Sequence, residues 1–337
     1  MSARLSGLVA LSWLIASSVL AEQGPVLDVH LHAATADMNG PPGQAVCVPM
    51  LAHLPTPDPA VPWPRQFMGA MMNPRCEDPV VGPSTDDEVM RQTIEQLEQN
   101  QAIGVLSGPP DRVRAWMAAA PGRFLPSLQL NLARDPYGPE EVRSLLTDGG
   151  FLVIGEISNQ YQGIGPDDER MDGFYAVAAE LDVPVAIHMG TGPPGAAMLM
   201  PSYRVRLGDP MLLEPVLAKY PNLRVTIMHM AEGFPSQLKT LLYTYPNVYV
   251  DIGGLSWMRT AEEFERTLLD LVDAGFGGRI MFGSDQMNWP GLITPAIDVI
   301  RESPYLTDAE KEAILWSNAV RFLKLDDAEM RKRAAAE

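Results

Sequence analysis

Two histidines one residue apart are the first feature of this sequence that could do chemistry. They are His30 and His32, at the end of the apolar stretch LDVHLH that spans residues 27–32. If this stretch is a β-strand, alternate side chains face the same side, so the two imidazoles point in the same direction. They could then share one metal ion. Because a His-x-His pair is common by chance, the other ligands must come from elsewhere in the chain.

Further histidines and carboxylates also fall at the ends of apolar runs. Four of the five histidines of the chain occur there, and the fifth, His53, lies in a proline-rich segment and is predicted to be a surface residue. Each candidate alone would more often be structural, as a hydrogen-bonded core histidine, a helix cap or an ion-paired glutamate. Together, at the same end of successive elements, they favour a metal site. The predicted metal ligands are His30, His32, Glu156, His188, His229 and Asp285.

This ligand set indicates a catalytic divalent ion. Imidazole and carboxylate suit Zn²⁺, Mn²⁺, Fe²⁺ or Ni²⁺, and we expect one or two ions, with zinc as the first choice. A catalytic ion lowers the pKa of a bound water to about 7, and a neighbouring carboxylate can then take its proton. Asp285 and His229 are the predicted catalytic residues. His229 would either hold a second ion or polarise a substrate carbonyl.

Eight short apolar runs alternate with segments of helical pattern, and they are the elements that must position these side chains. The runs are nearly continuous rather than alternating, which is typical of parallel strands buried on both faces. Eight such units predict an α/β fold of the (β/α)8 TIM-barrel type, in which all strand ends converge on one mouth. A doubly wound open sheet is the alternative, but it would spread the same ends along an edge. The expected strands cover residues 26–32, 102–108, 123–130, 151–157, 184–190, 223–230, 247–254 and 279–286.

The composition fits a single large domain at residues 22–337, preceded by a targeting segment. The chain has 337 residues and a formal net charge of −17, which argues against a nucleic-acid partner. Residues 1–21 resemble a signal peptide: Arg4 precedes an apolar run, and cleavage is expected after Ala21. A retained membrane anchor is the alternative, although the apolar run is short for a membrane-spanning helix, which needs about 20 residues. We expect an exported protein, periplasmic or secreted, with no stable membrane span after cleavage, a small-molecule substrate and scope for a homo-oligomer.

A proline-rich insertion follows the first strand. Residues 41–64 contain eight prolines, which disfavour regular helix and central strand, so residues 41–80 are predicted to form a long ordered loop. Cys47 and Cys76 lie within it. In an oxidising compartment they would form a disulfide that pins the segment, and the alternative is two buried free thiols.

The order of these motifs resembles that of the amidohydrolase superfamily. LDVHLH, VPVAIHMG, VTIMHM, NVYVDIGG, MFGSDQ and SNAVRFLKL are similar to its amidohydrolase-related branch, also called amidohydrolase 2. That branch includes metal-dependent hydrolases and enzymes like aminocarboxymuconate semialdehyde decarboxylase. The resemblance covers nearly the whole chain except the insertion. It implies that His30, His32, His188 and Asp285 are ligands or near-ligands and that His229 is a ligand or a catalytic group.

The fourth strand distinguishes types of site within that superfamily. Many members place there a carbamylated lysine that bridges two metals, but no lysine of this chain ends a predicted strand. Glu156 takes that place, which slightly favours a two-metal site. We therefore expect a metal-dependent hydrolase that uses activated water on a small-molecule ester, lactone or amide. The alternatives are a nonoxidative decarboxylase on the same scaffold and a non-catalytic barrel that only binds a ligand.

Several loop residues are predicted to lie at the mouth of the barrel. Residues 190–195, GTGPPG, match a dinucleotide-binding pattern literally, but two prolines and the absence of a following helix predict a flexible substrate loop instead. Arg204, Trp257, Arg259 and Trp289 are further candidates for contact with a substrate carboxylate or ring.

Overall fold

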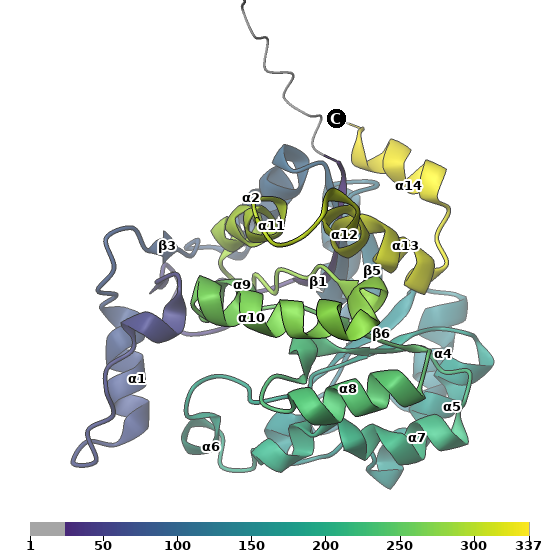
Figure 1. Cartoon of the computed structure of the whole chain (residues 1–337), viewed down its shortest axis with the longest axis horizontal. Coiled ribbons are helices and arrows are strands. Elements are labelled where there is room, and N and C mark those ends of the chain that lie inside the picture. The colour runs from purple at the N-terminus through teal and green to yellow at the C-terminus, as the bar shows by residue number, and fades with distance from the viewer. Residues whose placement is uncertain (1–23, 337) are drawn as a thin grey trace, which may run out of the picture.

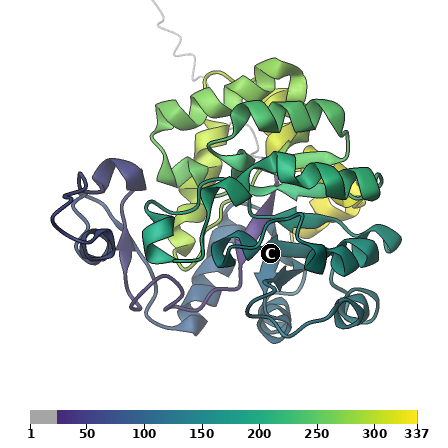
Figure 2. The same ribbon diagram turned by 90° about the horizontal axis from the view of Figure 1, so that it is seen from below.

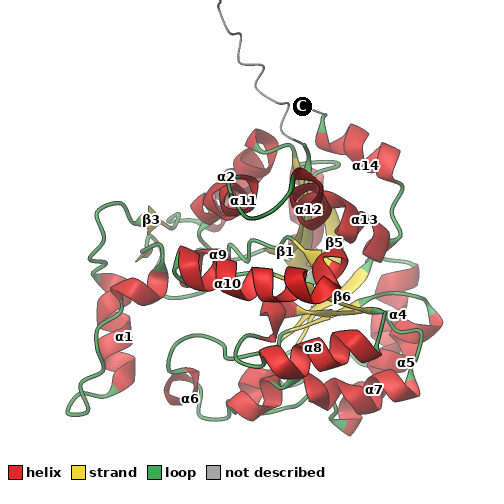
Figure 3. Ribbon diagram, in the orientation of Figure 1, coloured by secondary structure: helices red, strands yellow, loops and turns green. Residues whose placement is uncertain are grey.

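The eight predicted strands form one parallel sheet that curls into a barrel. The structure, a computed structural model, describes residues 24–336. Each strand pairs in parallel with the next along the chain, and helices surround the sheet (Figure 3). The strands, in sheet order, are β1 (Val26–His32), β4 (Ala102–Gly108), β5 (Phe124–Leu130), β6 (Val153–Ile157), β7 (Val185–Ile187), β8 (Val225–Ile227), β9 (Val248–Asp251) and β10 (Ile280–Met281).

Backbone hydrogen bonds between β1 and the segment after β10 bring the two ends of the sheet together. The Val29 N–H donates to the Phe282 carbonyl at 2.9 Å, and the Asp285 N–H donates to the His30 carbonyl at 2.9 Å. The predicted (β/α)8 TIM barrel is therefore confirmed, and the open-sheet alternative is excluded.

An irregularity in β1 turns its two histidines into the barrel. The pairing of β1 with β4 shifts register between Asp28 and Leu31. Leu27 and Val29 belong to the apolar cluster inside the barrel, whereas Leu31 packs in the outer cluster beneath the helices. In a regular strand, side chains two residues apart face the same side, so Leu27, Val29 and Leu31 would all lie on one face without the shift. The shift thus changes the face of the strand, so that His30 and His32 face the interior at its carboxyl end.

Amphipathic helices cover the outside of the barrel. The first of them begins at a capping box, with the Glu88 N–H donating to Thr85 Oγ1 at 3.3 Å and the Thr85 N–H donating to Glu88 Oε2 at 3.2 Å. The helices that follow the barrel strands are α2 (Asp86–Gln99), α3 (Pro110–Ala119), α4 (Pro139–Thr147), α5 (Asp172–Glu180), α6 (Ala196–Leu199), α7 (Glu214–Lys219), α8 (Pro235–Thr244), α9 (Leu255–Met258), α10 (Ala261–Leu271), α11 (Ile293–Arg301), α12 (Asp308–Glu312), α13 (Asn318–Leu323) and α14 (Asp327–Ala334).

The insertion after β1 is more regular than the predicted loop. It projects from one side of the barrel, at the left of Figures 1 and 2. It contains the antiparallel pair β2 (Ala45–Val46) and β3 (Val80–Val81), the short 3-10 helix η1 (Met50–His53) and the helix α1 (Trp63–Met72). The prediction of no helix fails from Trp63 onward because Pro64 lies in the first turn, where a missing N–H costs nothing.

A disulfide and an apolar cluster hold the insertion. Cys47 and Cys76 are bonded, as predicted. Val46, Met50 and Met71 pack together with side chains of the barrel loops, namely Trp257, Trp289 and Leu292. His53 is partly exposed in η1, in line with a surface residue.

The expected signal peptide at residues 1–21 lies outside the described residues. Among residues 24–336, none of the helices has both the length and the apolar character needed to cross a bilayer.

Loss of the disulfide is expected to loosen the insertion and spare the barrel. The bond closes a loop with a sequence separation of 29 residues, which corresponds to about 3–4 kcal/mol of chain entropy. In a variant with both Cys47→Ser and Cys76→Ser, limited proteolysis should cut within residues 41–80 much faster than in the oxidised protein. Cleavage between β4 and α13 serves as the control and should not change. Equal cleavage of the insertion in both proteins would contradict this.

Candidate metal centre

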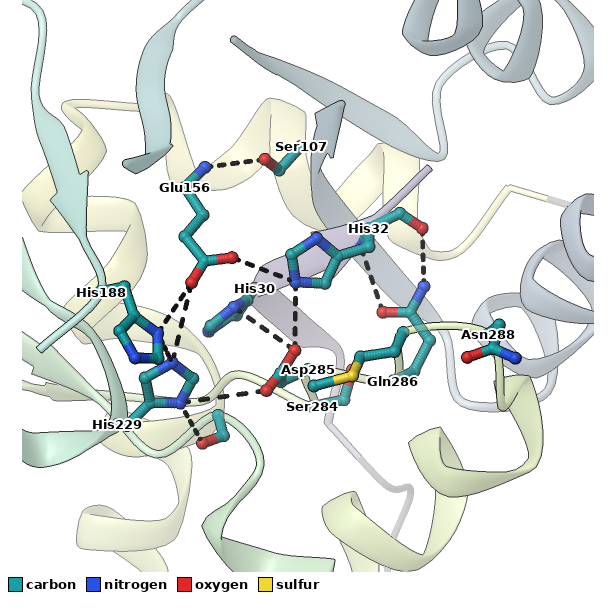
Figure 4. Close-up of polar contacts among 12 residues, drawn as sticks. His30, His32, Ser107, Glu156, His188, His229, Ser284, Asp285, Gln286 and Asn288 are labelled. Atoms are coloured by element: carbon teal, nitrogen blue, oxygen red, sulfur yellow. Dashed lines mark hydrogen bonds and ion pairs between the residues drawn. The ribbon is translucent and has the colours of Figure 1, made fainter. Parts of the chain in front are cut away.

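The six predicted ligands converge at the carboxyl ends of the barrel strands (Figure 4). They come from β1, from β6 and from the segments directly after β7, β8 and β10, and all six are buried. Three of them are not on strands: His188 follows β7, His229 lies in the 3-10 turn η6 (Met228–Ala231), and Asp285 lies in the segment after β10. The structure thus brings together His30, His32, Glu156, His188, His229 and Asp285.

Left-handed backbone conformations aim two of these side chains. His229 has a φ of 56° and Asp285 a φ of 51°, which are unfavourable values for residues with a Cβ atom. Hydrogen bonds hold both positions: the His229 N–H donates to Asp251 Oδ1 at 3.1 Å, and the Asp285 N–H donates to the His30 carbonyl. Such backbone strain is typical of sites where function demands the geometry.

Glu156 lies at the centre of the cluster. Its Oε2 is 3.6 Å from His32 Nε2, and its Oε1 is 2.9 Å from His188 Nδ1 and 3.9 Å from His229 Nε2. Figure 4 shows this carboxylate between His32 on one side and the other two imidazoles on the opposite side. It therefore belongs to two overlapping ligand triads, one with His30 and His32 and one with His188 and His229. This arrangement agrees with the bridging position expected from the sequence.

Asp285 completes a third triad, with His30 and His229. Its Oδ1 lies 3.1 Å from His32 Nε2 and 3.6 Å from His30 Nε2, and its Oδ2 lies 3.9 Å from His229 Nδ1. The ligand atoms of each triad lie within 4.8 Å of one another. One carboxylate thus faces three histidines at the floor of the site.

The donor set fits a divalent cation. His30 Nε2, His32 Nδ1 and His188 Nε2 are buried without a hydrogen-bond partner among the described residues, although buried polar atoms are normally paired. The buried carboxylates of Glu156 and Asp285 accompany the four histidines, so the site carries net negative charge when the imidazoles are neutral. A cation bound to His30 Nε2 and His188 Nε2 would give these two atoms a partner, and its charge would offset the negative charge of the site. These residues could hold one ion, or two that share Glu156.

Asp251, at the end of β9, is a functional residue that the sequence analysis missed. Its carboxylate oxygens lie 3.3 and 3.4 Å from His30 Nδ1, and it also accepts the N–H groups of His229 and Gly253. With Nδ1–H directed at Asp251, His30 presents Nε2 to the site. The signal was available, because Asp251 ends the apolar run NVYV, just as the other candidates end theirs.

Backbone contacts fix the remaining histidines. The His229 Nδ1–H donates to the Gly253 carbonyl at 2.8 Å, so its Nε2 faces Glu156 and His188. Gln286 holds the backbone of His32 from both sides, since its Nε2 donates to the His32 carbonyl at 2.8 Å and its Oε1 accepts the His32 N–H at 3.1 Å. The His229 imidazole and the His32 backbone are therefore held by contacts that involve no ligand.

The buried charges shift one another's pKa values. Burial disfavours a charged His30, but the carboxylates of Asp251 and Asp285 outweigh this and raise the pKa of His30 to about 10. Burial would raise the pKa of Glu156, but hydrogen bonds with His188 and His229 hold it well below its usual value. Burial and the neighbouring His229 lower the pKa of His188. Without a metal ion, the cluster therefore keeps a proton on His30 at neutral pH.

A pocket of about 480 Å³ opens above the cluster. Its floor is polar, and its walls contain Trp257 and Trp289 as predicted, together with Thr191 to Pro193 of the expected substrate loop. The two arginine candidates do not contribute to the lining: Arg204 bonds backbone carbonyls, and Arg259 pairs with Glu232. The apolar part of the wall consists of Met38, Met50, Phe67, Met68, Met71, Met189, Leu199, Met200, Trp257, Met258, Met287 and Trp289.

The family model of the amidohydrolases matches residues 27–325. This range includes all eight barrel strands except Val26, the first residue of β1. The chain belongs to the amidohydrolase family. This agrees with the resemblance of its motifs, and the family range includes the insertion, which the motif resemblance left out.

A gamma-resorcylate decarboxylase from Rhodococcus jostii (strain RHA1) is 26% identical to this chain over 274 residues, which are 68% of this chain and 79% of the relative. Among solved structures, a TIM-barrel protein from Bordetella bronchiseptica matches with a TM-score of 0.56 and 16% identity, over 93% of this chain and 100% of its own. A 5-carboxyvanillate decarboxylase from Sphingomonas paucimobilis matches with a TM-score of 0.55 and 14% identity, over 90% and 99% of the two chains. The two structures support the barrel fold.

Removal of the Asp251 charge is expected to weaken metal binding. In the variant Asp251→Asn, His30 loses the carboxylate that orients it, and the affinity for Zn²⁺ should fall about 10- to 100-fold in a chelator competition assay. Asp270→Asn is the control, because Asp270 forms a surface ion pair with Lys239. Unchanged affinity in the Asp251 variant would remove that residue from the site.

Metal affinity is expected to rise with pH. The metal-free protein carries a proton on His30, whose pKa is about 10, whereas a ligating imidazole must be neutral. Binding thus displaces a proton, and each pH unit below that pKa should weaken the affinity up to about tenfold. Titrations at about pH 6.5 and 8.5, with proton release measured by calorimetry in two buffers, would check this. An affinity independent of pH would show that no proton is displaced.

Proposed function

We propose that this protein is a metal-dependent nonoxidative decarboxylase that acts on a carboxylated ring. The observation that carries the proposal is the cation-binding cluster at the floor of a pocket whose walls are largely apolar. The decarboxylase from Rhodococcus supports it as well, so the alternative of the sequence analysis is favoured over ester, lactone or amide hydrolysis. An ionised acid group would sit at the polar floor and the ring against the apolar wall.

The bound ion would supply positive charge that holds the substrate carboxylate. Asp285 faces His30, His32 and His229, and it would take up a proton from solvent and pass it to the ring carbon that bears the carboxylate. That carbon gains a C–H bond, its bond to the carboxylate breaks with the electron pair left on the ring, and carbon dioxide departs. The apolar wall excludes water from the ring, and it suits the neutral product better than the charged substrate.

In the proposed reaction, His229 acts through its Nε2 atom. Because Nδ1–H is directed at the Gly253 carbonyl, Nε2 is the atom available to a ring oxygen of the substrate or to a second ion. Asp251 acts through His30 and His229 and is a positioning residue in this scheme.

Hydrolysis remains the second candidate because of Glu156. Its two carboxylate oxygens face different histidines, which is the arrangement a pair of ions would need. Two-metal sites of this kind activate water for hydrolysis. A metal content near two ions per chain, with cleavage of esters or amides and no release of carbon dioxide, would favour this candidate.

We further propose that the protein works in an oxidising compartment outside the cytoplasm. The Cys47–Cys76 disulfide supports this, because such bonds are rare in reducing compartments. Zinc is the ion proposed for the site, with manganese, iron and nickel as alternatives.

The proposed reaction is tested with phenolic acids such as 2,6-dihydroxybenzoate and the metal-loaded protein. Carbon dioxide should appear together with one equivalent of the decarboxylated phenol. The variant Asp285→Asn should lower turnover by about 10²- to 10⁴-fold, because it removes the proton donor. Asp298→Asn, at a partly exposed position on α11 that does not line the pocket, is the control.

Substrate binding and melting temperature must be measured in parallel, so that loss of the fold or of the metal is not mistaken for loss of catalysis. Near-normal turnover in the Asp285 variant would remove Asp285 from the mechanism. Release of an alcohol or amine in place of carbon dioxide, across a panel of acids and esters, would overturn the decarboxylase proposal.

A further inference from the structure

The insertion contributes part of the apolar wall of the pocket. Four of its residues line the cavity, namely Met50, Phe67, Met68 and Met71, and all four are apolar. None of the four belongs to the ligand triads of histidines and carboxylates. The cavity therefore has one end that suits an anion held by a cation and another end that suits an uncharged, apolar group.

Hydrogen bonds attach the insertion to the mouth at two points. Trp63 Nε1–H, in the first turn of α1, donates to the Pro194 carbonyl of the substrate loop at 3.0 Å. Trp289 Nε1–H, on the loop after β10, donates to the Gln44 carbonyl at 2.9 Å. The insertion thus bridges from the loop after β10 to the loop after β7, and it covers the pocket between them.

The insertion also packs against apolar side chains of the barrel loops that line the pocket. Met50 and Met71 belong to the same buried cluster as Trp257 and Trp289, and all four line the cavity. The disulfide joins Cys47, three residues before Met50, to Cys76, five residues after Met71. The segment that carries the lining residues is therefore held at both of its ends, which lowers the ordering cost of ligand binding.

We propose that the insertion selects the substrate, favouring carboxylic acids that carry an extended aromatic or other apolar group beyond the ring at the floor. The inference that the ligand is a carboxylic acid rests on the proposed function. The inference that the insertion selects the ligand rests on the contacts of the insertion itself. Thioether side chains are unbranched and polarisable, adapt to irregular shapes and form favourable contacts with aromatic rings. The volume of about 480 Å³ falls within the range of sites that hold drug-sized ligands.

Equilibrium binding of two simple acids tests this without any need for turnover. Benzoate has no group beyond its single ring, and biphenyl-4-carboxylate adds an apolar extension that would reach the insertion. Calorimetry on the metal-loaded protein should show that the biphenyl acid binds at least about tenfold tighter than benzoate. The variant Met71→Gln, of similar size but polar, should reduce this preference about tenfold, because it weakens binding of the biphenyl acid more than binding of benzoate.

Met72→Gln is the matched control, because Met72 is adjacent on α1, is 48% exposed and does not line the pocket. It should keep the full preference. Since Met71 is buried, Phe67→Leu provides a second variant that keeps an apolar side chain and loses the aromatic contact; it too should lower the preference. Thermal unfolding of each metal-loaded variant confirms that the fold survives.

The outcomes separate this inference from the proposed reaction. If the preference depends on Met71 and Phe67 and yet neither acid nor any phenolic acid is decarboxylated, the reaction is wrong and the selecting role of the insertion stands. Equal binding of the two acids by the unmodified protein would overturn the inference. So would an equal loss of preference in the Met71 and Met72 variants, or a full preference in both the Met71 and Phe67 variants.

Discussion

The site depends on the burial of opposite charges at one end of the barrel. Asp251, Asp285 and Glu156 are buried with four histidines in a space where ionised groups alone would be very costly. Their mutual attraction is visible in the low pKa of Glu156 and the high pKa of His30. A cation placed among them would take over the role of the proton on His30. The same charges thus offset one another's burial without a metal and create the affinity for one.

The barrel maintains this arrangement through contacts that contribute no ligand. Asp28 accepts the N–H groups of His30 and Ser284, and burial raises its pKa to about 6. The hydrogen bond from the Ser284 N–H to Asp28 and the contacts of Gln286 with His32 join β1 to the segment after β10. The closure of the barrel and the geometry of the site are therefore one structural feature. A change that opened this seam would displace His30, His32 and Asp285 at once.

The scaffold and the insertion have separate roles. The barrel carries the ligand cluster and places the chain in its family, whereas the insertion contributes no member of that cluster. It contributes instead the apolar end of the pocket, fixed by the disulfide and by Trp63 and Trp289. Chemistry and selectivity would then reside in different parts of the chain, which agrees with the general tendency of barrel enzymes to vary their loops on a constant core.

The sequence by itself determined the barrel, its eight strands and the six residues of the cluster. Those features depend on local hydrophobic patterns and on residue type at strand ends, which can be read one segment at a time. Only the tertiary structure revealed Asp251 as the partner of His30, the register shift in β1 and the left-handed turns at His229 and Asp285. These arise from contacts between residues distant in the chain, and no local pattern specifies them. The helix α1 and its place over the pocket were likewise decided by packing against Trp257 and Trp289, because proline content alone predicts a loop there.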